Sequence, residues 1–230
     1  MTVTSPSRHA ANRALRTPGA RYRARIETTS AATLQSRLIA SEVSNLTEAF
    51  DRLAADGSVC RAAALTVKAR RRFVIGSGKS HAYATLLAAD LSTAVAQVNL
   101  VDDSSTSLLD LLSDVRESDV LVAFSFRRYR RSTVAAAREF TAAGGTVVAV
   151  TDDEAAPLAE HARELVVVAT DSASYADSPT AVAATSHVLA TLTTASAKGA
   201  RRRFADRDRI SEDLGLYLDD AGPSPVQDQS

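Results

Sequence analysis

The chain has 230 residues, with 27 basic and 27 acidic side chains and a formal net charge of zero. This length fits one domain of ordinary size with extensions. The zero net charge does not indicate binding to nucleic acid or to a membrane. The single cysteine, Cys60, excludes an internal disulfide and fits a reducing compartment, and we expect it to lie in the core. Because the sequence has neither an apolar run of membrane-spanning length nor a secretory signal, we expect a cytoplasmic protein that does not engage a membrane.

Residues 1–30 are basic and show no hydrophobic periodicity. The first 40 residues hold seven arginines against one acidic residue, Glu27. We therefore expect 1–30 to be a disordered tail. Its arginines leave DNA or RNA binding open as an alternative, with salt-dependent affinity and little base specificity.

Residues 31–70 predict two N-terminal helices. Apolar residues recur there at alternating spacings of four and three: Ile39, Val43, Leu46, Phe50 and Leu53. This stripe predicts a helix that ends at Gly57, and a shorter helix follows over 60–70. We expect the stripe to pack on the domain or on a second copy of the chain.

From residue 71 to 200, short apolar runs alternate with helical patterns. The predicted strands cover 73–75, 97–101, 120–124, 146–150 and 165–168. The predicted helices cover 80–94, 105–112, 132–143, 156–162 and 179–197. This alternation predicts an α/β fold with a five-stranded parallel, doubly wound sheet flanked by helices. The remaining residues, 201–230, form a charged C-terminal extension, expected to be a surface helix or partly ordered up to 218 and acidic at its end.

The first predicted strand runs into Gly76-Ser77-Gly78-Lys79-Ser80, where a helix begins. Backbone N–H groups and a helix N-terminus at one point suit an anion such as phosphate. A nucleotide P-loop is excluded because the glycine it needs falls at Phe73, and a dinucleotide fingerprint is excluded because its third glycine falls at His81.

A second loop follows the third strand and begins at Ser125. It holds four arginines and two hydroxyls at a helix start: Arg127, Arg128, Arg130, Arg131, Ser132 and Thr133. Arginine can hold a phosphate through two parallel hydrogen bonds. Ser132 or Thr133 can equally be a plain helix cap, and some of the arginines can simply be solvated. The carboxyl ends of parallel strands meet at one edge, so both loops predict an anion site there.

At this point the sequence resembles the sugar isomerase (SIS) domain family, over about residues 40–200. The resemblance rests on the first loop, on Ser125, and on Val148-Ala149-Val150-Thr151-Asp152 with Pro157-Leu158-Ala159. Two further segments are similar to the SIS domains of RpiR/MurR-type transcriptional regulators: Ser125-Phe126-Arg127-Arg128-Tyr129 and Asp177-Ser178. On this basis the SIS domain is expected to span 71–200.

The resemblance implies binding of a phosphorylated sugar or similar small anion, and a homodimer. The implied ligand-binding residues are Gly76, Ser77, Gly78, Lys79, Ser80, Ser125, Arg127, Ser132, Thr133 and Ser178. No metal and no cofactor are expected. Binding without catalysis fits an RpiR-like effector-sensing module.

The sequence departs from the family pattern in two places. The family loop after the third strand reads Ser-x-Ser-Gly-x-Thr, whereas here Arg127, Arg128 and Arg130 replace the second serine, the glycine and the threonine. Either guanidinium groups replace hydroxyls around the anion, or the ligand differs from a simple phosphosugar. Residues 1–38 are also too short for the helix-turn-helix domain of such regulators, so we expect that module to be absent.

The alternative function is a phosphosugar aldose–ketose isomerase, which needs a base near the sugar carbon. The candidates are His81, His161, Asp177 and His187, and each histidine is equally well explained as a surface or core residue. Asp102-Asp103 could hold a sugar hydroxyl or begin a helix. No catalytic residue is assigned from the sequence.

Overall fold

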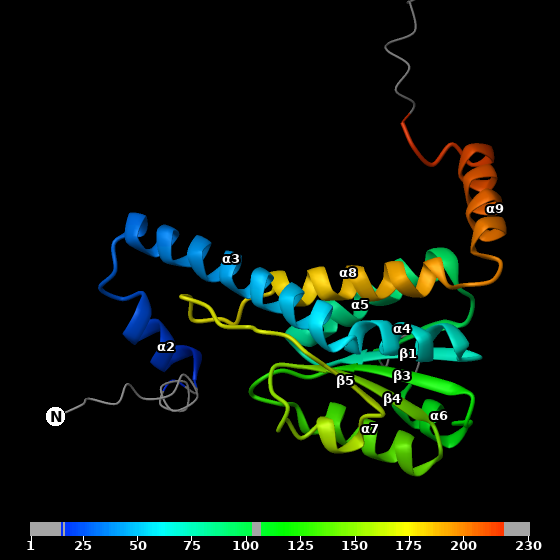
Figure 1. The fold of residues 1–230 in the computed structure, drawn as a ribbon, viewed down its shortest axis with the longest axis horizontal. Coiled ribbons are helices and arrows are strands. Elements are labelled where there is room, and N and C mark those ends of the chain that lie inside the picture. The colour runs from blue at the N-terminus through cyan, green and yellow to red at the C-terminus, as the bar shows by residue number, and fades with distance from the viewer. Residues whose placement is uncertain (1–14, 16, 103–106, 219–230) are drawn as a thin grey trace, which may run out of the picture.

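The structure, a computed structural model, describes residues 15, 17–102 and 107–218 (Figure 1). Its centre is a parallel sheet of five strands: β1 (Arg71–Gly76), β2 (Val98–Val101), β3 (Asp119–Phe124), β4 (Thr146–Thr151) and β5 (Glu164–Val167). The strand order is β2-β1-β3-β4-β5. The predicted α/β fold with a five-stranded parallel sheet is confirmed.

Helices cover both faces of the sheet (Figure 1). One layer contains α3 (Ala31–Asp56), α4 (Ser58–Lys68), α5 (Lys79–Ala94) and α8 (Thr180–Ala195). The other layer contains α6 (Leu108–Ser113), α7 (Arg131–Ala142) and the short 3₁₀ helix η1 (Ala159–His161). Helices α2 (Pro18–Arg25) and α9 (Ala200–Asp213) lie outside these layers.

Each layer packs on its own hydrophobic core. Alternate residues of β3 divide between them: Val122 and Phe124 pack with α4, α5 and α8, whereas Leu121 and Ala123 pack with Phe140 of α7. All six residues of β3 are buried, as expected for a central parallel strand covered on both faces.

The strand register brings the two predicted loops together. Gly76 at the end of β1 pairs with Phe124 at the end of β3, so Ser77 and Ser125 leave neighbouring strands at the same level. The chain continues from β1 to β2 on one side, while β3 pairs on the other. This reversal is the switch point where ligands of such sheets bind.

The start of β1 is fixed by two arginines. Arg71 pairs with the fully buried Asp119, which raises the pKa of Arg71 through a side-chain hydrogen bond. Arg72 is 7 % exposed and donates to Thr66 O at 2.7 Å, Val67 O at 2.8 Å and Ala96 O at 2.9 Å. Its guanidinium therefore satisfies carbonyls at the end of α4, while burial lowers its pKa.

Helix α3 begins with Ser30 as its N-cap and ends at Gly57, which has the left-handed φ of +65°. The predicted apolar stripe is only partly covered. Leu53 is 6 % exposed, whereas Ile39, Val43 and Phe50 are 57 %, 58 % and 45 % exposed. The face of α3 buried on the domain instead includes Asn45 and Ala49.

Three local expectations were wrong. Residues 18–25, expected to be disordered, form α2, whose N-cap Thr17 accepts from Ala20 N. The helix predicted over 156–162 is reduced to η1, because its N–H groups bond three residues back, as His161 does to Leu158 O. Cys60 is exposed because the buried face of α4 runs through Val59, Ala62 and Ala63.

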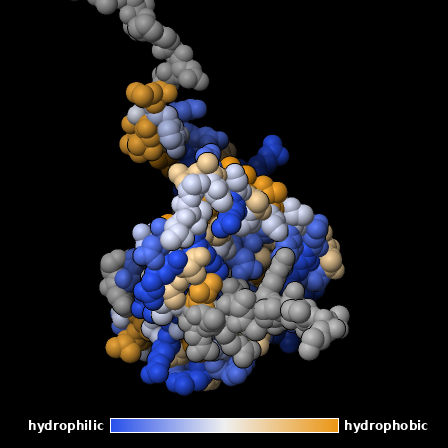
Figure 2. Space-filling view, turned by 90° about the vertical axis from the view of Figure 1, so that its left-hand side faces the viewer, coloured by the Kyte–Doolittle hydropathy of each residue, from blue (hydrophilic) through white to orange (hydrophobic). Residues whose placement is uncertain are grey.

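Several expectations lie partly or wholly outside the described residues. They are the tail before residue 15, the start of the 105–112 helix, Asp103 and the acidic end after 218. Within the described residues, hydrophobic side chains gather beyond α9, where Leu214, Leu216 and Leu218 are exposed (Figure 2).

Candidate anion-binding site

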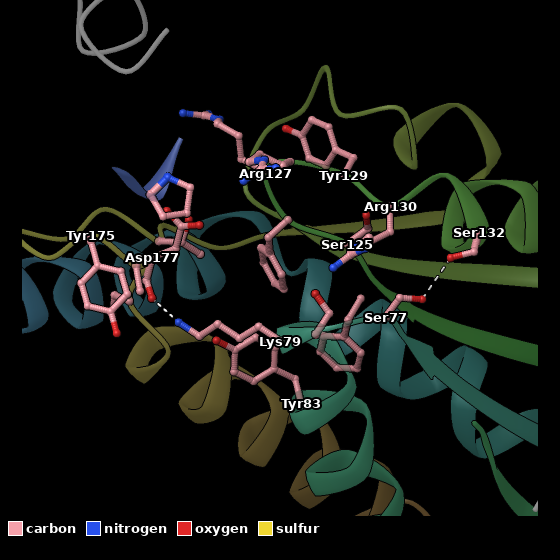
Figure 3. A pocket seen from close by; sticks show the side chains of 18 of the residues that line it. Ser77, Lys79, Tyr83, Ser125, Arg127, Tyr129, Arg130, Ser132, Tyr175 and Asp177 are labelled. Carbon is pink, nitrogen blue, oxygen red and sulfur yellow. Dashed lines mark hydrogen bonds between the residues drawn. The ribbon is translucent and has the colours of Figure 1, made fainter. Parts of the chain in front are cut away.

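A cavity of about 850 Å³ opens at the carboxyl ends of β1 and β3 (Figure 3). Its walls come from the loops after these strands, from helix α2, and from residues 168–179, which we call the β5–α8 segment. The predicted edge of the sheet therefore holds a cavity, and both predicted loops line it.

The loop after β1 is shaped by its glycines. A Cβ on Gly76 would lie 2.3 Å from the Ser80 carbonyl oxygen, so only glycine lets the strand pass so close to α5. Gly78 has φ +64° and ψ −128°, a conformation that glycine alone adopts readily. Ser77 Oγ lies 3.2 Å from Ser132 Oγ and 3.1 Å from Thr133 Oγ1, linking the loop to the start of α7.

Ser125 is the first residue after β3 and is 2 % exposed. Its N–H donates to Val150 O at 3.1 Å, and its carbonyl oxygen accepts from Thr151 Oγ1 at 2.7 Å. Among the described residues, its hydroxyl has no hydrogen-bond partner. A buried hydroxyl normally has one, so the unpartnered Ser125 Oγ is a candidate donor to a group in the cavity that this residue lines.

Arg127 is turned toward acidic groups. Its Nε lies 3.5 Å from Asp152 Oδ2, and its Nη2 lies 3.7 Å from Asp153 Oδ2. Burial alone would lower the Arg127 pKa, but Asp152 and neighbouring groups outweigh it and the pKa is raised. Burial raises the pKa of Asp152, with Arg127 opposing this. Burial and Asp152 also raise the pKa of Tyr129.

Arg130 lies against the first loop. It is the N-cap residue of α7, and its guanidinium lies beside Gly78. No ion pair of Arg130 is present in the described part of the chain. Arg130 therefore brings a cation to the point where the N-termini of α5 and α7 meet, the role expected of Arg127.

The opposite end of the cavity is tied to α2 and α3. Lys79 Nζ donates to the Asp177 carbonyl oxygen (Figure 3), and Arg21 of α2 pairs with the Asp177 carboxylate. Ser178 is 1 % exposed, and its hydroxyl donates to Glu42 of α3. Burial lowers the pKa of Lys79.

The lining is strongly cationic. Among the described residues it has six basic side chains: Arg21, Lys79, Arg127, Arg128, Arg130 and Arg131. Asp177 is the one acidic side chain that lines it there. Hydroxyls of Ser77, Ser80, Ser125 and Ser132 complete a set of donors suited to an anion.

The structure places most of the predicted site residues on this cavity: Ser77, Lys79, Ser80, Ser125, Arg127, Ser132 and Ser178. Gly76 and Gly78 line a smaller neighbouring cavity of about 410 Å³, which Ser77 and Ser132 share. Thr133 is fully buried behind Ser77.

The residues that line the larger cavity include several that sequence reasoning did not assign to the site, among them Arg21, Tyr83, Arg130 and Tyr175. Burial raises the pKa of Tyr83 to about 12, so its hydroxyl remains a donor at neutral pH. Arg130 is one of the four arginines that the sequence places in the loop after the third strand. Arg21 carried no sequence signal beyond the basic tail.

The candidate bases of the isomerase alternative lie mostly elsewhere. His81 lines the smaller cavity, and His161 lies in η1. The His187 side chain is 77 % exposed and faces Asp90 at 4.0 Å. Asp177 is the one candidate on the larger cavity, where Arg21 holds it.

Within residues 15, 17–102 and 107–218, no three His, Cys, Asp or Glu side chains gather in a way that would hold a metal ion. No helix in the same residues is long and apolar enough to cross a membrane.

Comparisons with known proteins agree with this fold. A family model described as the SIS domain matches residues 65–198. The sugar isomerase domain of an RpiR transcription factor from Sphaerobacter thermophilus matches with a TM-score of 0.71 and 23 % identity, covering 79 % of this chain and 99 % of that one. No curated protein matches the sequence.

Two further solved structures share the fold. The Vibrio vulnificus NanR protein complexed with ManNAc-6P matches with a TM-score of 0.64 and 16 % identity, over 79 % of this chain and 70 % of that one. A Methanococcus jannaschii protein, for which a 3-hexulose-6-phosphate isomerase function is inferred, matches with a TM-score of 0.55 and 15 % identity, over 80 % and 98 %. The family match spans more than half of the chain, so the chain belongs to the SIS domain family.

Proposed function

We propose that this protein binds a phosphorylated sugar at the cavity between the β1 and β3 loops and acts as an RpiR-like, effector-sensing module. The observation that carries the proposal is the hydroxyl of Ser125. The hydroxyl is buried and has no partner among the described residues, and Ser125 lines a cavity that the first residues of α5 and α7 also line. A phosphate oxygen is the acceptor that this hydroxyl and the N–H groups at the starts of the two helices favour together.

The cationic lining supports a phosphate over an uncharged sugar. Arg130 is beside Gly78 and has no ion pair among the described residues, so it offers a guanidinium to the phosphate. Arg127 is engaged by Asp152 and Asp153, so its contribution is smaller. In this arrangement Arg130 takes over the task that hydroxyls perform in the usual family loop.

The mechanism is sensing through a change of population. A ligand that bridges the two loops favours the arrangement in which they are close. The ligand can shift the equilibrium between the two arrangements only by as much as its affinities for them differ. Ser77, Ser125 and Arg130 hold the phosphate, while Lys79 and Ser178 lie toward the sugar.

A homodimer is part of the proposal. Ile39, Val43 and Phe50 form an exposed apolar strip along α3, beside the face that packs on the domain. A second copy is the occupant that the family resemblance implies. Val43→Glu should yield a monomer in analytical ultracentrifugation, whereas Ser44→Glu, at an exposed polar position, should not. A Val43→Glu variant that sediments like the wild type would overturn this assignment.

The binding proposal is tested with a panel of hexose 6-phosphates and N-acetylhexosamine 6-phosphates, including N-acetylmannosamine 6-phosphate, and the unphosphorylated sugars. A bound compound should raise the melting temperature, because it stabilises only the folded state. Calorimetry should then give an affinity that falls at least tenfold in Ser77→Ala/Ser125→Ala and stays unchanged in Ser36→Ala, an exposed serine on α3.

Two results would contradict the proposal. One is a panel in which no phosphorylated compound binds a well-folded sample. The other is an affinity that the double serine variant retains. Turnover of a bound ketose or aldose phosphate, followed by NMR, would favour the isomerase alternative instead.

A further inference from the structure

Helix α2 is attached to the domain through polar contacts at the mouth of the cavity. None of its residues is buried, so apolar packing contributes little to its position. Its contacts are those of Arg21 with Asp177 and of Arg25 Nη1 with Ser172 O at 2.6 Å and Ser174 O at 3.0 Å. All three partners belong to the β5–α8 segment.

This attachment places α2 on the ligand side of the segment. Pro18 and Arg21 line the large cavity, as do Tyr175 and Asp177 of the β5–α8 segment. The Arg21 side chain is 13 % exposed and that of Asp177 is 28 % exposed, so the pair is largely removed from solvent. A part-buried pair of this kind is screened less by salt than an exposed one.

Asp177 also contacts the loop after β1, which is proposed to bind the phosphate. Lys79, which follows Gly78, donates to its carbonyl oxygen, and the neighbouring Ser178 donates to Glu42. The position of α2 is thus linked through one residue to the start of α5. Substituting Arg21 should therefore affect the end of the cavity that contains Asp177, which is away from Arg130 and Ser125.

We infer that helix α2 is a wall of the ligand site and that Arg21 determines specificity for the sugar end of the ligand, away from the phosphate. This inference rests on the proposed function. It adds a binding residue from a segment that precedes the SIS domain. Pairing with Asp177 orients the Arg21 guanidinium and leaves its remaining N–H groups to donate to sugar oxygens.

Two probes separate this inference from the proposed function. Inorganic phosphate should occupy the loops at Ser77 and Ser125 and lie beyond the reach of α2. A full phosphosugar from the panel, such as N-acetylmannosamine 6-phosphate, should fill both ends. Arg21→Ala should therefore weaken binding of the phosphosugar on the order of tenfold and leave binding of inorganic phosphate unchanged, since it removes a charged hydrogen-bond donor to the sugar.

The matched control is Arg23→Ala, because Arg23 is exposed on the same helix and carries the same charge. It should change neither affinity. Ser77→Ala/Ser125→Ala should weaken both probes. Hydrogen exchange supplies a readout without ligand: the amides of 22–25 should be protected in the wild type and in Arg23→Ala, and should lose protection in Arg21→Ala.

The outcomes are distinguishable. If both probes weaken in the serine variant while Arg21→Ala behaves like Arg23→Ala, the proposed function stands and this inference is overturned. Equal weakening of phosphate and phosphosugar in Arg21→Ala also overturns it, because Arg21 would then act only on the overall field. If no compound in the panel binds, both are overturned. If the α2 amides of the wild type are unprotected, the assignment of α2 as a wall of the ligand site is overturned.

Discussion

Arg130 lies over Gly78, although 52 positions separate them in the sequence: a Cβ built on Gly78 would be 3.1 Å from Arg130 Nη2. This contact joins the loop after β1 to the start of α7. It depends on the absence of a side chain at Gly78 and on its φ of +64°. The two loops therefore constrain each other before any ligand arrives.

Gly78→Ala should both destabilise the protein and weaken phosphate binding. The left-handed φ disfavours alanine by roughly 1–2 kcal/mol, and the new methyl group displaces Arg130. Urea unfolding and phosphate calorimetry measure the two effects. Gly199→Ala is the control, since Gly199 has φ +91° and nothing within 4 Å of an added Cβ. Unchanged phosphate affinity in Gly78→Ala would refute the role of this contact.

Arg130→Ala should reduce phosphate affinity about tenfold, as expected for losing a charged hydrogen-bond donor to an anion. Arg127→Ala should reduce it less, because Arg127 already faces Asp152 and Asp153. Arg138→Ala, an exposed change on the same helix, is the reference for lost charge alone. A larger effect of Arg127→Ala would show that Arg127, and not Arg130, makes the main contact with the phosphate.

The order of elements was predictable because each strand and helix carries its own local pattern. Contacts such as Arg21 with Asp177 were not, because they join residues 156 positions apart and depend on where loops settle. The exposure of Cys60 shows the same limit, since a helix is readable from periodicity while its buried side in an alanine-rich segment is not. The choice of Arg130 over Arg127 depends on acidic partners that come from the end of β4.

Asp152 should make part of the stability pH-dependent. Its folded-state pKa is raised above the ordinary value of 3.8, so the folded state binds this proton more readily than the unfolded state. The penalty for the buried carboxylate is fully present above the raised pKa. It is relieved as the pH falls through the raised pKa toward 3.8.

The comparison with Asp152→Asn isolates this effect, because asparagine does not titrate. The wild type should gain free energy of unfolding relative to the variant as the pH is lowered from 7.5 to 4.5 in a urea series. Other carboxylates, such as Asp56 with its lowered pKa, contribute equally to both proteins and cancel. A difference that is flat, or that moves toward the variant at low pH, would show that the Asp152 pKa is not raised.

Arg72→Ala should be among the most damaging single changes outside the cavity. It removes a buried side chain and leaves three carbonyls without their donor. We expect a loss of roughly 3 kcal/mol in the free energy of unfolding. Arg70→Ala, at an exposed position two residues earlier, should change stability by less than about 0.5 kcal/mol. Similar midpoints for the two variants in chemical denaturation would contradict this account.

Helices α5 and α7 lie on opposite faces of the sheet (Figure 1), yet the loop that leads into α5 contacts the first turn of α7 through Ser77, Ser132 and Thr133. Each helix belongs to a different hydrophobic core. An anion bound by both N-termini would connect the two helical layers of the domain at a single point. The rigidity it confers should consequently spread through both layers, so that amides as distant as those of α4 and α6 exchange more slowly when the cavity is filled.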